Sequence, residues 1–342
     1  MSDDFEPVRL GIAGTGFISQ VHAACATESP YVELVGIASA RGRASRERVG
    51  ELDAAVQLLT LDELFASDEV EAVMVCTRTS DHAAHAVEVL GRGKHLLLEK
   101  PGATTVPGQE LIGDVAAAHP ELVAMVAYHR RHDARFRDLA ERIAAGQIGE
   151  PFAIHLTSRE DYPPSDADVA AGGFIMDVGV HEFDTARWLL GRDPTAVFTK
   201  VHAPVYGDTD VDNAYITIAL GDAAATVILS RTSPYGMDIR CEVVGPGGSI
   251  RIAEPAVGGG TAVLTADSQS DFPADCRGRF RDAYQAQMDA FGRACRGQET
   301  AGATLDDDRW AVATAVAART SGVRGERLDV GPSWDWNLAP SG

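Results

Sequence analysis

The sequence predicts two successive folds: an α/β domain with a parallel, doubly wound sheet, then an α+β domain with a large, mostly antiparallel, open sheet. In the first third, apolar strands alternate with helical stretches, and this alternation requires crossover connections and helices on both faces of a parallel sheet. After about residue 125, runs with strand character follow one another with turn signals between them. We expect domains at 1–125 and 126–330, followed by a tail at 331–342.

The elements of the first domain follow from its apolar runs and the polar, periodic segments between them. Strands are expected at 8–13, 32–38, 70–76 and 95–98, and helices at 17–28, 43–50, 61–65 and 80–92.

The second domain begins with a helix at 133–145 that ends at Gly146, a residue suited to a helix C-cap. The turn signals Gly221-Asp222 and Pro246-Gly247-Gly248 predict hairpins. Strands are expected at 152–158, 196–202, 213–220, 223–231, 240–245 and 249–252, and further helices at 177–190, 280–296 and 308–320.

Composition narrows the classes of partner. The formal net charge of −20 repels nucleic acid phosphates and anionic membrane surfaces, so we expect a small-molecule partner instead. The acidic N-terminus lacks the pattern of a signal peptide, and no apolar run is long enough to span a bilayer, which favours a cytoplasmic location. Five scattered cysteines without a CxxC pair predict neither a disulfide framework nor a metal site.

A glycine-rich loop directly follows the first expected strand and opens a helix. Gly14 permits the tight turn, and Gly16 lets the backbone approach a pyrophosphate at the helix N-terminus, where Phe17 and Ile18 begin the helix. We assign these four residues to a dinucleotide cofactor, which makes the first domain a nucleotide-binding Rossmann domain. The alternative is an ordinary glycine turn.

The end of the second expected strand bears on the choice of cofactor. NAD enzymes usually carry an acidic residue there for the ribose diol, but this chain has Ser39, followed by Arg41 and Arg43. A hydroxyl and guanidinium groups would hold a 2′-phosphate that a carboxylate would repel. We therefore expect NADP to be preferred and NAD to be possible; if the arginines are only surface charges, NAD or both cofactors would serve.

Asp177 and His181 are four residues apart, which places both side chains on one face of a helix. A carboxylate beside an imidazole fixes its tautomer and tunes it as a base near neutral pH. The alternative is a histidine that Asp177 satisfies for structural reasons alone.

Four motifs together resemble one enzyme family. They are residues 11–16 with His22, residues 76–82 with His85, residues 93–95 leading to Glu99-Lys100-Pro101, and residues 177–184. From about residue 8 to residue 330 the chain resembles the glucose-fructose oxidoreductase, inositol dehydrogenase and MocA-like oxidoreductases. Residues 157–159 and 235–242 look like inositol 2-dehydrogenases in particular. The chain departs from the family at Ser39, Arg78 and His129, where the family often has Asp, Pro and Asn.

The resemblance implies roles for individual residues. Lys100 would polarise or stabilise the reacting oxygen, and Pro101 would follow a cis peptide bond that directs Lys100 into the cleft. His181 would be the general base, supported by Asp177. The cofactor set is completed by Thr77, Glu99 and Lys100, and the substrate set consists of Lys100, Arg159, Asp177, His181 and Tyr235.

These residues predict an NAD(P)-dependent dehydrogenase that oxidises a secondary hydroxyl of a cyclic polyol or sugar, with inositol-like substrates first. The alternatives are a sugar-nucleotide or aminosugar dehydrogenase of a biosynthetic pathway, and a non-catalytic NAD(P)-sensing regulator of the same fold. Hydride transfer to a nicotinamide needs no metal ion. The resemblance also implies that an apolar outer sheet face is buried in a homodimer or homotetramer.

Overall fold

The computed structural model describes residues 6–49, 53–207, 209–252, 264, 272–298 and 302–331. The chain divides into two compact units: unit 1 comprises Met1–His132 and Asp282–Asp308, and unit 2 comprises Asp133–Arg281 and Arg309–Gly342. The segment 282–308, which the sequence analysis placed in the second domain, belongs to unit 1 because it returns to that unit's strands. The Val126 N–H, for example, donates to the carbonyl oxygen of Ala303 at 2.9 Å.

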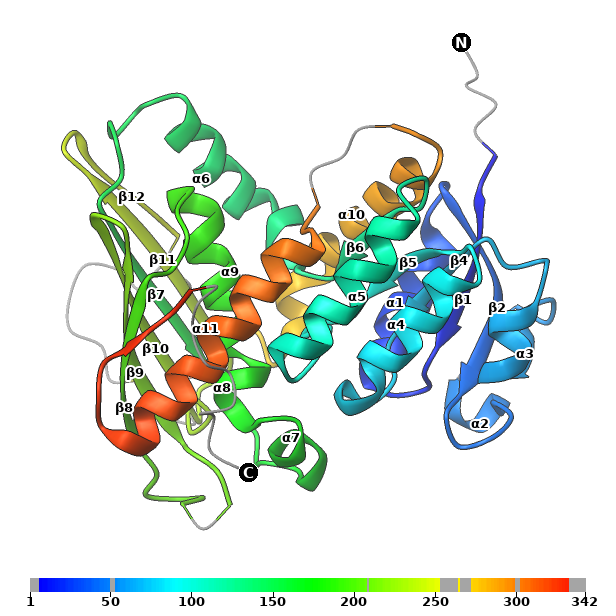
Figure 1. The fold of residues 1–342 in the computed structure, drawn as a ribbon, viewed down its shortest axis with the longest axis horizontal. Coiled ribbons are helices and arrows are strands. Elements are labelled where there is room, and N and C mark those ends of the chain that lie inside the picture. The colour runs from blue at the N-terminus through cyan, green and yellow to red at the C-terminus, as the bar shows by residue number, and fades with distance from the viewer. Residues whose placement is uncertain are drawn as a thin grey trace. The chain divides into compact units, whose positions relative to one another are not determined.

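Unit 1 is built on a six-stranded parallel sheet in the order β3-β2-β1-β4-β5-β6 (Figure 1). The strands are β1 (Val8–Ala13), β2 (Val32–Ser39), β3 (Gln57–Thr60), β4 (Ala72–Val75), β5 (His95–Leu98) and β6 (Ala124–Val126). The strand order reverses between β1 and β4, and such a switch point opens a crevice at the carboxyl ends of the strands, where α/β folds bind ligands. The predicted parallel, doubly wound sheet is confirmed.

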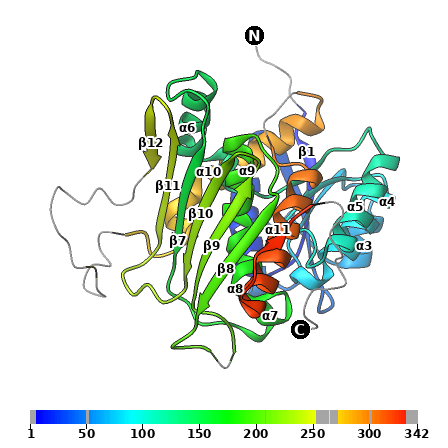
Figure 2. The ribbon, with the colours of Figure 1, turned by 60° about the vertical axis from the view of Figure 1, so that its left-hand side comes forward.

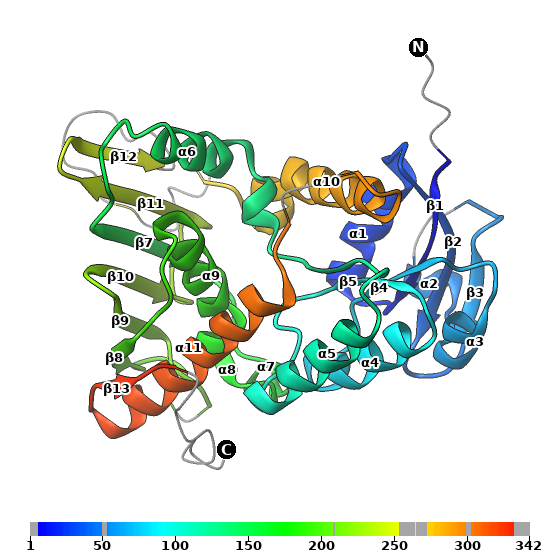
Figure 3. The same cartoon turned by 45° about the horizontal axis from the view of Figure 1, so that its top comes forward.

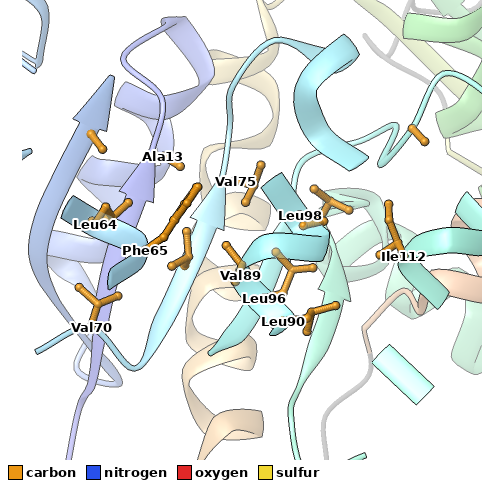
Figure 4. Packing of buried hydrophobic residues seen from close by; sticks show 14 residues of the cluster. Ala13, Leu64, Phe65, Val70, Val75, Val89, Leu90, Leu96, Leu98 and Ile112 are labelled. Carbon is orange, nitrogen blue, oxygen red and sulfur yellow. The ribbon is translucent and has the colours of Figure 1, made fainter. Parts of the chain in front are cut away.

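Apolar helix faces cover the sheet of unit 1. Its helices are α1 (Phe17–Glu28), α2 (Arg46–Val49), α3 (Leu61–Ala66), α4 (His82–Gly91) and α5 (Val106–Ala118), with short 3-10 helices η1 (Thr79–Asp81) and η2 (His129–His132). Figure 4 shows Phe65 of α3, Val89 of α4 and Ile112 of α5 in one buried cluster with strand residues such as Val75 and Leu98. Burial of these side chains holds the strand ends, and the loops that follow them, in fixed positions.

Four elements of unit 1 were missed from the sequence: β3, α5, β6 and the short 3-10 helix η2. The two strands are only four and three residues long, which is too short to establish a period of two. Helix α5 carried a readable signal, because the Thr105 side chain accepts a hydrogen bond from the Gly108 N–H and Pro107 lies in the first turn.

Unit 2 is built on a seven-stranded sheet in the order β12-β11-β7-β10-β9-β8-β13 (Figure 2). The strands are β7 (Ala153–Arg159), β8 (Ala196–His202), β9 (Asn213–Leu220), β10 (Ala223–Ser230), β11 (Asp238–Gly245), β12 (Gly248–Ile252) and β13 (Leu328–Asp329). Only β7 and β10 pair in parallel; the other neighbours are antiparallel. The predicted hairpins are confirmed as β9–β10 and β11–β12.

Helices of unit 2 gather on one face of this sheet (Figure 3). They are α6 (Ala134–Ala144), α7 (Asp166–Ala170), α8 (Gly173–Asp177), α9 (Gly179–Leu190) and most of α11 (Leu305–Arg324); α10 (Cys276–Cys295) begins in unit 2 and ends in unit 1. Helix α9 packs on β7 and β10. Inward-facing residues such as Ile216 and Ile218 are buried, whereas Tyr215, directly before Ile216 on the chain, is half exposed, as a one-sided sheet requires.

The single helix expected at 177–190 is two helices that meet at Val178. Val178 keeps helical dihedral angles (φ −94°, ψ −40°), so the backbone from Asp177 to His181 stays close to a helical path. Gly179 permits the close packing of α9, because a Cβ there would lie 3.0 Å from the Phe183 ring and 3.3 Å from Leu229.

Candidate active site

A pocket of about 510 Å³ opens in unit 1 beyond the carboxyl ends of β1, β2 and β4. Its lining residues are Gly14, Thr15, Gly16, Ser39, Ala40, Arg41, Cys76, Thr77 and Arg78. Five of these, Gly14, Gly16, Ser39, Arg41 and Thr77, are residues that the sequence assigned to the cofactor. The other predicted cofactor residues, Phe17, Ile18, Arg43, Glu99 and Lys100, are not among the lining residues.

The glycine loop has the shape that a dinucleotide requires. Gly14 has φ 138°, and a Cβ there would lie 2.3 Å from the Cys76 carbonyl oxygen, so only glycine fits between β1 and the end of β4. At Gly16, by contrast, nothing lies within 4 Å of the Cβ position, so a side chain would occupy open space beside the N-terminus of α1. The open space and the N–H groups of α1 suit a pyrophosphate.

Ser19 stands at the third glycine position of the loop. It is buried, and its hydroxyl donates to the Cys76 carbonyl oxygen at 3.4 Å. This contact holds the first turn of α1 against the end of β4, which a small side chain alone permits.

Ser39 and Arg41 lie together in the pocket, and Arg43 does not. The Ser39 hydroxyl accepts a hydrogen bond from the Arg41 N–H at 3.1 Å, which fixes the turn after β2. The Arg43 guanidinium instead donates to the Leu58 carbonyl oxygen at 2.7 Å and pairs with Glu63. Arg78, noted in the sequence only as a departure from its family, also lines the pocket, and its Nε donates to Asp81 Oδ2 at 3.3 Å.

The segment after β5, Glu99-Lys100-Pro101, is fixed by buried side chains of unit 1. The Lys100–Pro101 peptide bond is cis, as expected. One Glu99 carboxylate oxygen accepts from the Lys100 N–H at 2.9 Å, and the other lies 2.8 Å from His22 Nε2. Glu99 is only 5% exposed, so the carboxylate that binds the Lys100 N–H is itself buried and holds this backbone segment in place.

Two further contacts continue this fixation past Lys100. His82 Nδ1 lies 2.9 Å from the Pro101 carbonyl oxygen, and its Nε2 lies 3.1 Å from that of Thr77. The Gly102 N–H donates to Asp308 Oδ2 at 2.8 Å. His82 thus connects the pocket residue Thr77 with the Lys100 segment.

Unit 2 holds the other predicted catalytic residues. Asp177 ends α8, and His181 lies in the first turn of α9 with 9% exposure. The Tyr162 hydroxyl donates to Asp177 Oδ2 at 3.0 Å. Tyr162 was missed from the sequence, although it stands in the polar loop directly before Pro163-Pro164.

The predicted substrate residues Arg159 and Tyr235 converge on one buried carboxylate. Arg159 Nη1 lies 3.2 Å from Asp238 Oδ2, and the Tyr235 hydroxyl lies 3.5 Å from the same oxygen. Arg240 makes two further hydrogen bonds to Asp238, at 2.7 and 2.8 Å. Tyr235 is 8% exposed, and its ring packs beside Phe272. Its hydroxyl already contacts Arg159 and Asp238.

Within the described residues, no group of three or more His, Cys, Asp or Glu side chains is arranged to hold a metal ion. None of the helices in the described part of the chain is long and apolar enough to cross a membrane. None of the five cysteines, all of which lie in the described part of the chain, forms a disulfide bond.

Comparison with known proteins places this geometry in a family. The model described as the oxidoreductase family with an NAD-binding Rossmann fold matches residues 8–128, and the model of the GFO/IDH/MocA C-terminal domain matches residues 136–251. The scyllo-inositol 2-dehydrogenase (NAD(+)) of Bacillus subtilis is 30% identical over 325 residues, which are 92% of this chain and 94% of that protein. The chain belongs to the Gfo/Idh/MocA oxidoreductase family.

Other members of the Gfo/Idh/MocA family match over similar lengths. The inositol 2-dehydrogenase of Rhizobium meliloti is 30% identical and covers 91% of this chain and 96% of its own. The crystal structure of a myo-inositol dehydrogenase from Corynebacterium glutamicum superposes with a TM-score of 0.81 at 26% identity, covering 96% of this chain and all of its own. The family resemblance seen in the sequence is therefore confirmed, and so is the oxidoreductase class with an NAD-binding Rossmann domain.

Proposed function

We propose that the chain is an NAD(P)-dependent dehydrogenase that oxidises a secondary hydroxyl of a cyclic polyol, with inositols as the first candidates. The observation that carries the proposal is the match, over more than nine-tenths of the chain, to proteins named inositol 2-dehydrogenases. The chain also carries Lys100, Asp177 and His181. These side chains supply the acid, base and charge stabilisation that alcohol oxidation needs.

Each residue has one task in this reaction. NAD(P)⁺ bound in the pocket supplies the hydride acceptor. His181 removes the proton of the hydroxyl, and Asp177 holds the imidazole in the orientation that accepts it. Lys100 donates a hydrogen bond to the same oxygen and stabilises the negative charge that develops there. Lys100 belongs to unit 1, and Asp177 and His181 belong to unit 2.

NADP is the cofactor that we propose to be preferred, with NAD as a possible second. Ser39 presents a hydroxyl where an acidic residue would repel a 2′-phosphate, and the Arg41 and Arg78 side chains bring positive charge to the same pocket. The name of the Bacillus relative specifies NAD(+), so the preference rests on these residues alone. Replacing Ser39 with Asp should shift the preference toward NAD, which the ratio of kcat/KM for the two cofactors measures.

A substrate panel tests the reaction. Purified protein is incubated with NAD⁺ or NADP⁺ and with myo-inositol, scyllo-inositol, simple sugars, an aminosugar and a nucleotide sugar, and formation of the reduced cofactor is followed by absorbance. We expect turnover with an inositol. Turnover confined to the nucleotide sugar or aminosugar would replace the proposed substrate class, and tight cofactor binding without any turnover would point to a regulator.

We also propose a homodimer or homotetramer that buries the outer face of the unit 2 sheet. Phe198 of β8 is 42% exposed and Tyr215 of β9 is 50% exposed on that face. The face is less apolar than expected, because the exposed Lys200 and Thr217 lie directly across from these two rings. A single monomer mass in light scattering across a concentration series would count against the oligomer.

A further inference from the structure

The Tyr162 hydroxyl donates a hydrogen bond to Asp177, the carboxylate that we propose to orient the catalytic base. The hydroxyl oxygen is 3.0 Å from Asp177 Oδ2. The side chain comes from the loop after β7, whereas Asp177 ends α8, so the contact joins two separate elements of unit 2. A hydrogen bond from outside the helix restricts the rotation of the carboxylate about its own side-chain bonds.

A buried cation holds the Tyr162 ring in place. Arg231 is fully buried just beyond β10, and its guanidinium lies 5.1 Å from the centre of the Tyr162 ring and 4.6 Å from that of Phe174. Arg231 is itself paired with Asp210 at 3.2 Å. The two rings also pack edge to face at 6.1 Å. Such stacking leaves the phenol little freedom.

The backbone supports the same arrangement. The Tyr162 N–H donates to the Arg231 carbonyl oxygen at 3.3 Å, and Asp210 Oδ2 accepts from the Phe174 N–H at 2.8 Å. The loop that carries Tyr162 and the start of α8 are therefore held by one buried ion pair.

The phenol remains a donor at every pH at which the protein would work. Burial, together with the negative charge of Asp177, raises the pKa of Tyr162 well above its ordinary value. An un-ionised phenol beside a carboxylate donates its proton and withdraws part of the carboxylate's charge.

We infer that Tyr162 is a positioning residue that fixes Asp177 and limits how strongly Asp177 raises the basicity of His181. This rests on the proposed roles of Asp177 and His181. In the proposed mechanism Asp177 serves both the phenol and the imidazole, so removal of the phenol would leave more negative charge for the imidazole. The pKa of His181 then rises, and the carboxylate becomes freer to rotate.

The test replaces Tyr162 with Phe, which keeps the ring that Arg231 stacks on, and compares it with Tyr215→Phe on the outer sheet face as the matched control. The pKa of His181 is measured in the whole protein by NMR titration of labelled imidazoles, with His181→Gln used to assign its signal among the ten histidines. We expect Tyr162→Phe to raise the pKa by about half a unit or more and the control to leave it unchanged.

Other charged groups do not change between these proteins. The charged groups on α9 besides His181 are Glu182, Asp184 and Arg187, and those on the neighbouring segments include Asp177, Arg159, Glu160 and Arg231. All are retained in Tyr162→Phe, so a shift reports the phenol. A double-mutant cycle with Asp177→Asn tests whether Tyr162 acts through Asp177. If it does, Tyr162→Phe causes no further shift in the pKa of His181 in the Asp177→Asn variant.

Coinciding titrations in the wild type and Tyr162→Phe, or an equal shift in the Asp177→Asn background, would overturn the inference. With an inositol that is turned over, Tyr162→Phe should lower kcat about three- to tenfold and leave KM for the cofactor unchanged. The acidic limb of the plot of kcat/KM against pH should move to higher pH. Failure of the proposed function is seen separately, as full turnover by His181→Ala.

Discussion

Lys100 and His181 are the residues on which the proposed chemistry depends. We predict that Lys100→Ala and His181→Ala each lower the rate of the chemical step by about a hundredfold or more, because each removes a group that acts only as the proton and hydride leave. Cofactor binding should change little, since neither side chain lines the pocket of unit 1. Stopped-flow rates and a cofactor titration measure the two quantities.

Lys200→Ala is the matched control for Lys100→Ala, because Lys200 is exposed on the outer face of the unit 2 sheet. A comparable loss in the control, or wild-type rates in either of the other two variants, would show that the wrong groups have been assigned.

Arg41 and Arg43 are two residues apart, but their side chains have different surroundings. We predict that Arg41→Ala weakens NADP⁺ binding about tenfold or more, because it removes a guanidinium from the pocket, while NAD⁺ binding changes far less. Arg43→Ala is the control, since that guanidinium is held by Leu58 and Glu63. Isothermal titration with both cofactors provides the affinities, and equal losses in the two variants would contradict the assignment.

At the scale of elements, Asp308 fixes the loop that follows Lys100. This fully buried carboxylate accepts hydrogen bonds from the Gly102 N–H, the Gln109 amide and the Tyr128 hydroxyl, at 2.8, 2.5 and 2.6 Å. Its donors come from the loop after β5, from α5 and from the segment after β6. One side chain from the start of α11 thus joins three elements of unit 1.

We predict that Asp308→Ala lowers the free energy of unfolding by about 3 kcal/mol, because it leaves three buried donors unsatisfied. Asp306→Ala, an exposed position in the same helical turn, should cost less than about 0.5 kcal/mol. Urea unfolding followed by circular dichroism measures both. A small loss in Asp308→Ala would mean that water or another group replaces the carboxylate.

Local patterns predicted many elements of the sequence because burial on one or both faces leaves a readable period. The apolar runs of β1 and β4 and the alternation in β9 and β10 are of this kind. Short elements such as β3 carry too few residues for a period. The division of the expected helix at Val178 was also not predicted, because Val178 carries no sequence signal of a helix end.

At the scale of the whole molecule, ion pairs between distant segments make the stability of unit 1 depend on pH. Glu71, just before β4, accepts hydrogen bonds from Arg9 of β1 and from Arg296 beyond α10. Burial raises its pKa, but the hydrogen bonds from Arg296 and Arg9 outweigh burial and lower the pKa from 4.5 to about 2. The ionised form is therefore favoured by folding.

A depressed folded-state pKa gives stability that is fully present above the unfolded value of 4.5 and is lost as pH falls toward about 2. We predict that Glu71 contributes about 2 kcal/mol at neutral pH, after allowance for its partial exposure. Glu71→Gln should remove this contribution at pH 7 and flatten the decline between pH 4.5 and pH 2. Urea midpoints at several pH values test this, with the exposed Glu33→Gln as control.

The sequence alone determined the two folds, the family, the glycine loop and the Asp177–His181 spacing, because each depends on residues close together along the chain. Only the tertiary structure decided that residues 282–308 return to unit 1, that Arg43 turns to Glu63 while Arg41 faces the pocket, and that Tyr162 donates to Asp177. These contacts join segments with no common period, and their partners are selected by burial and charge after the chain has folded.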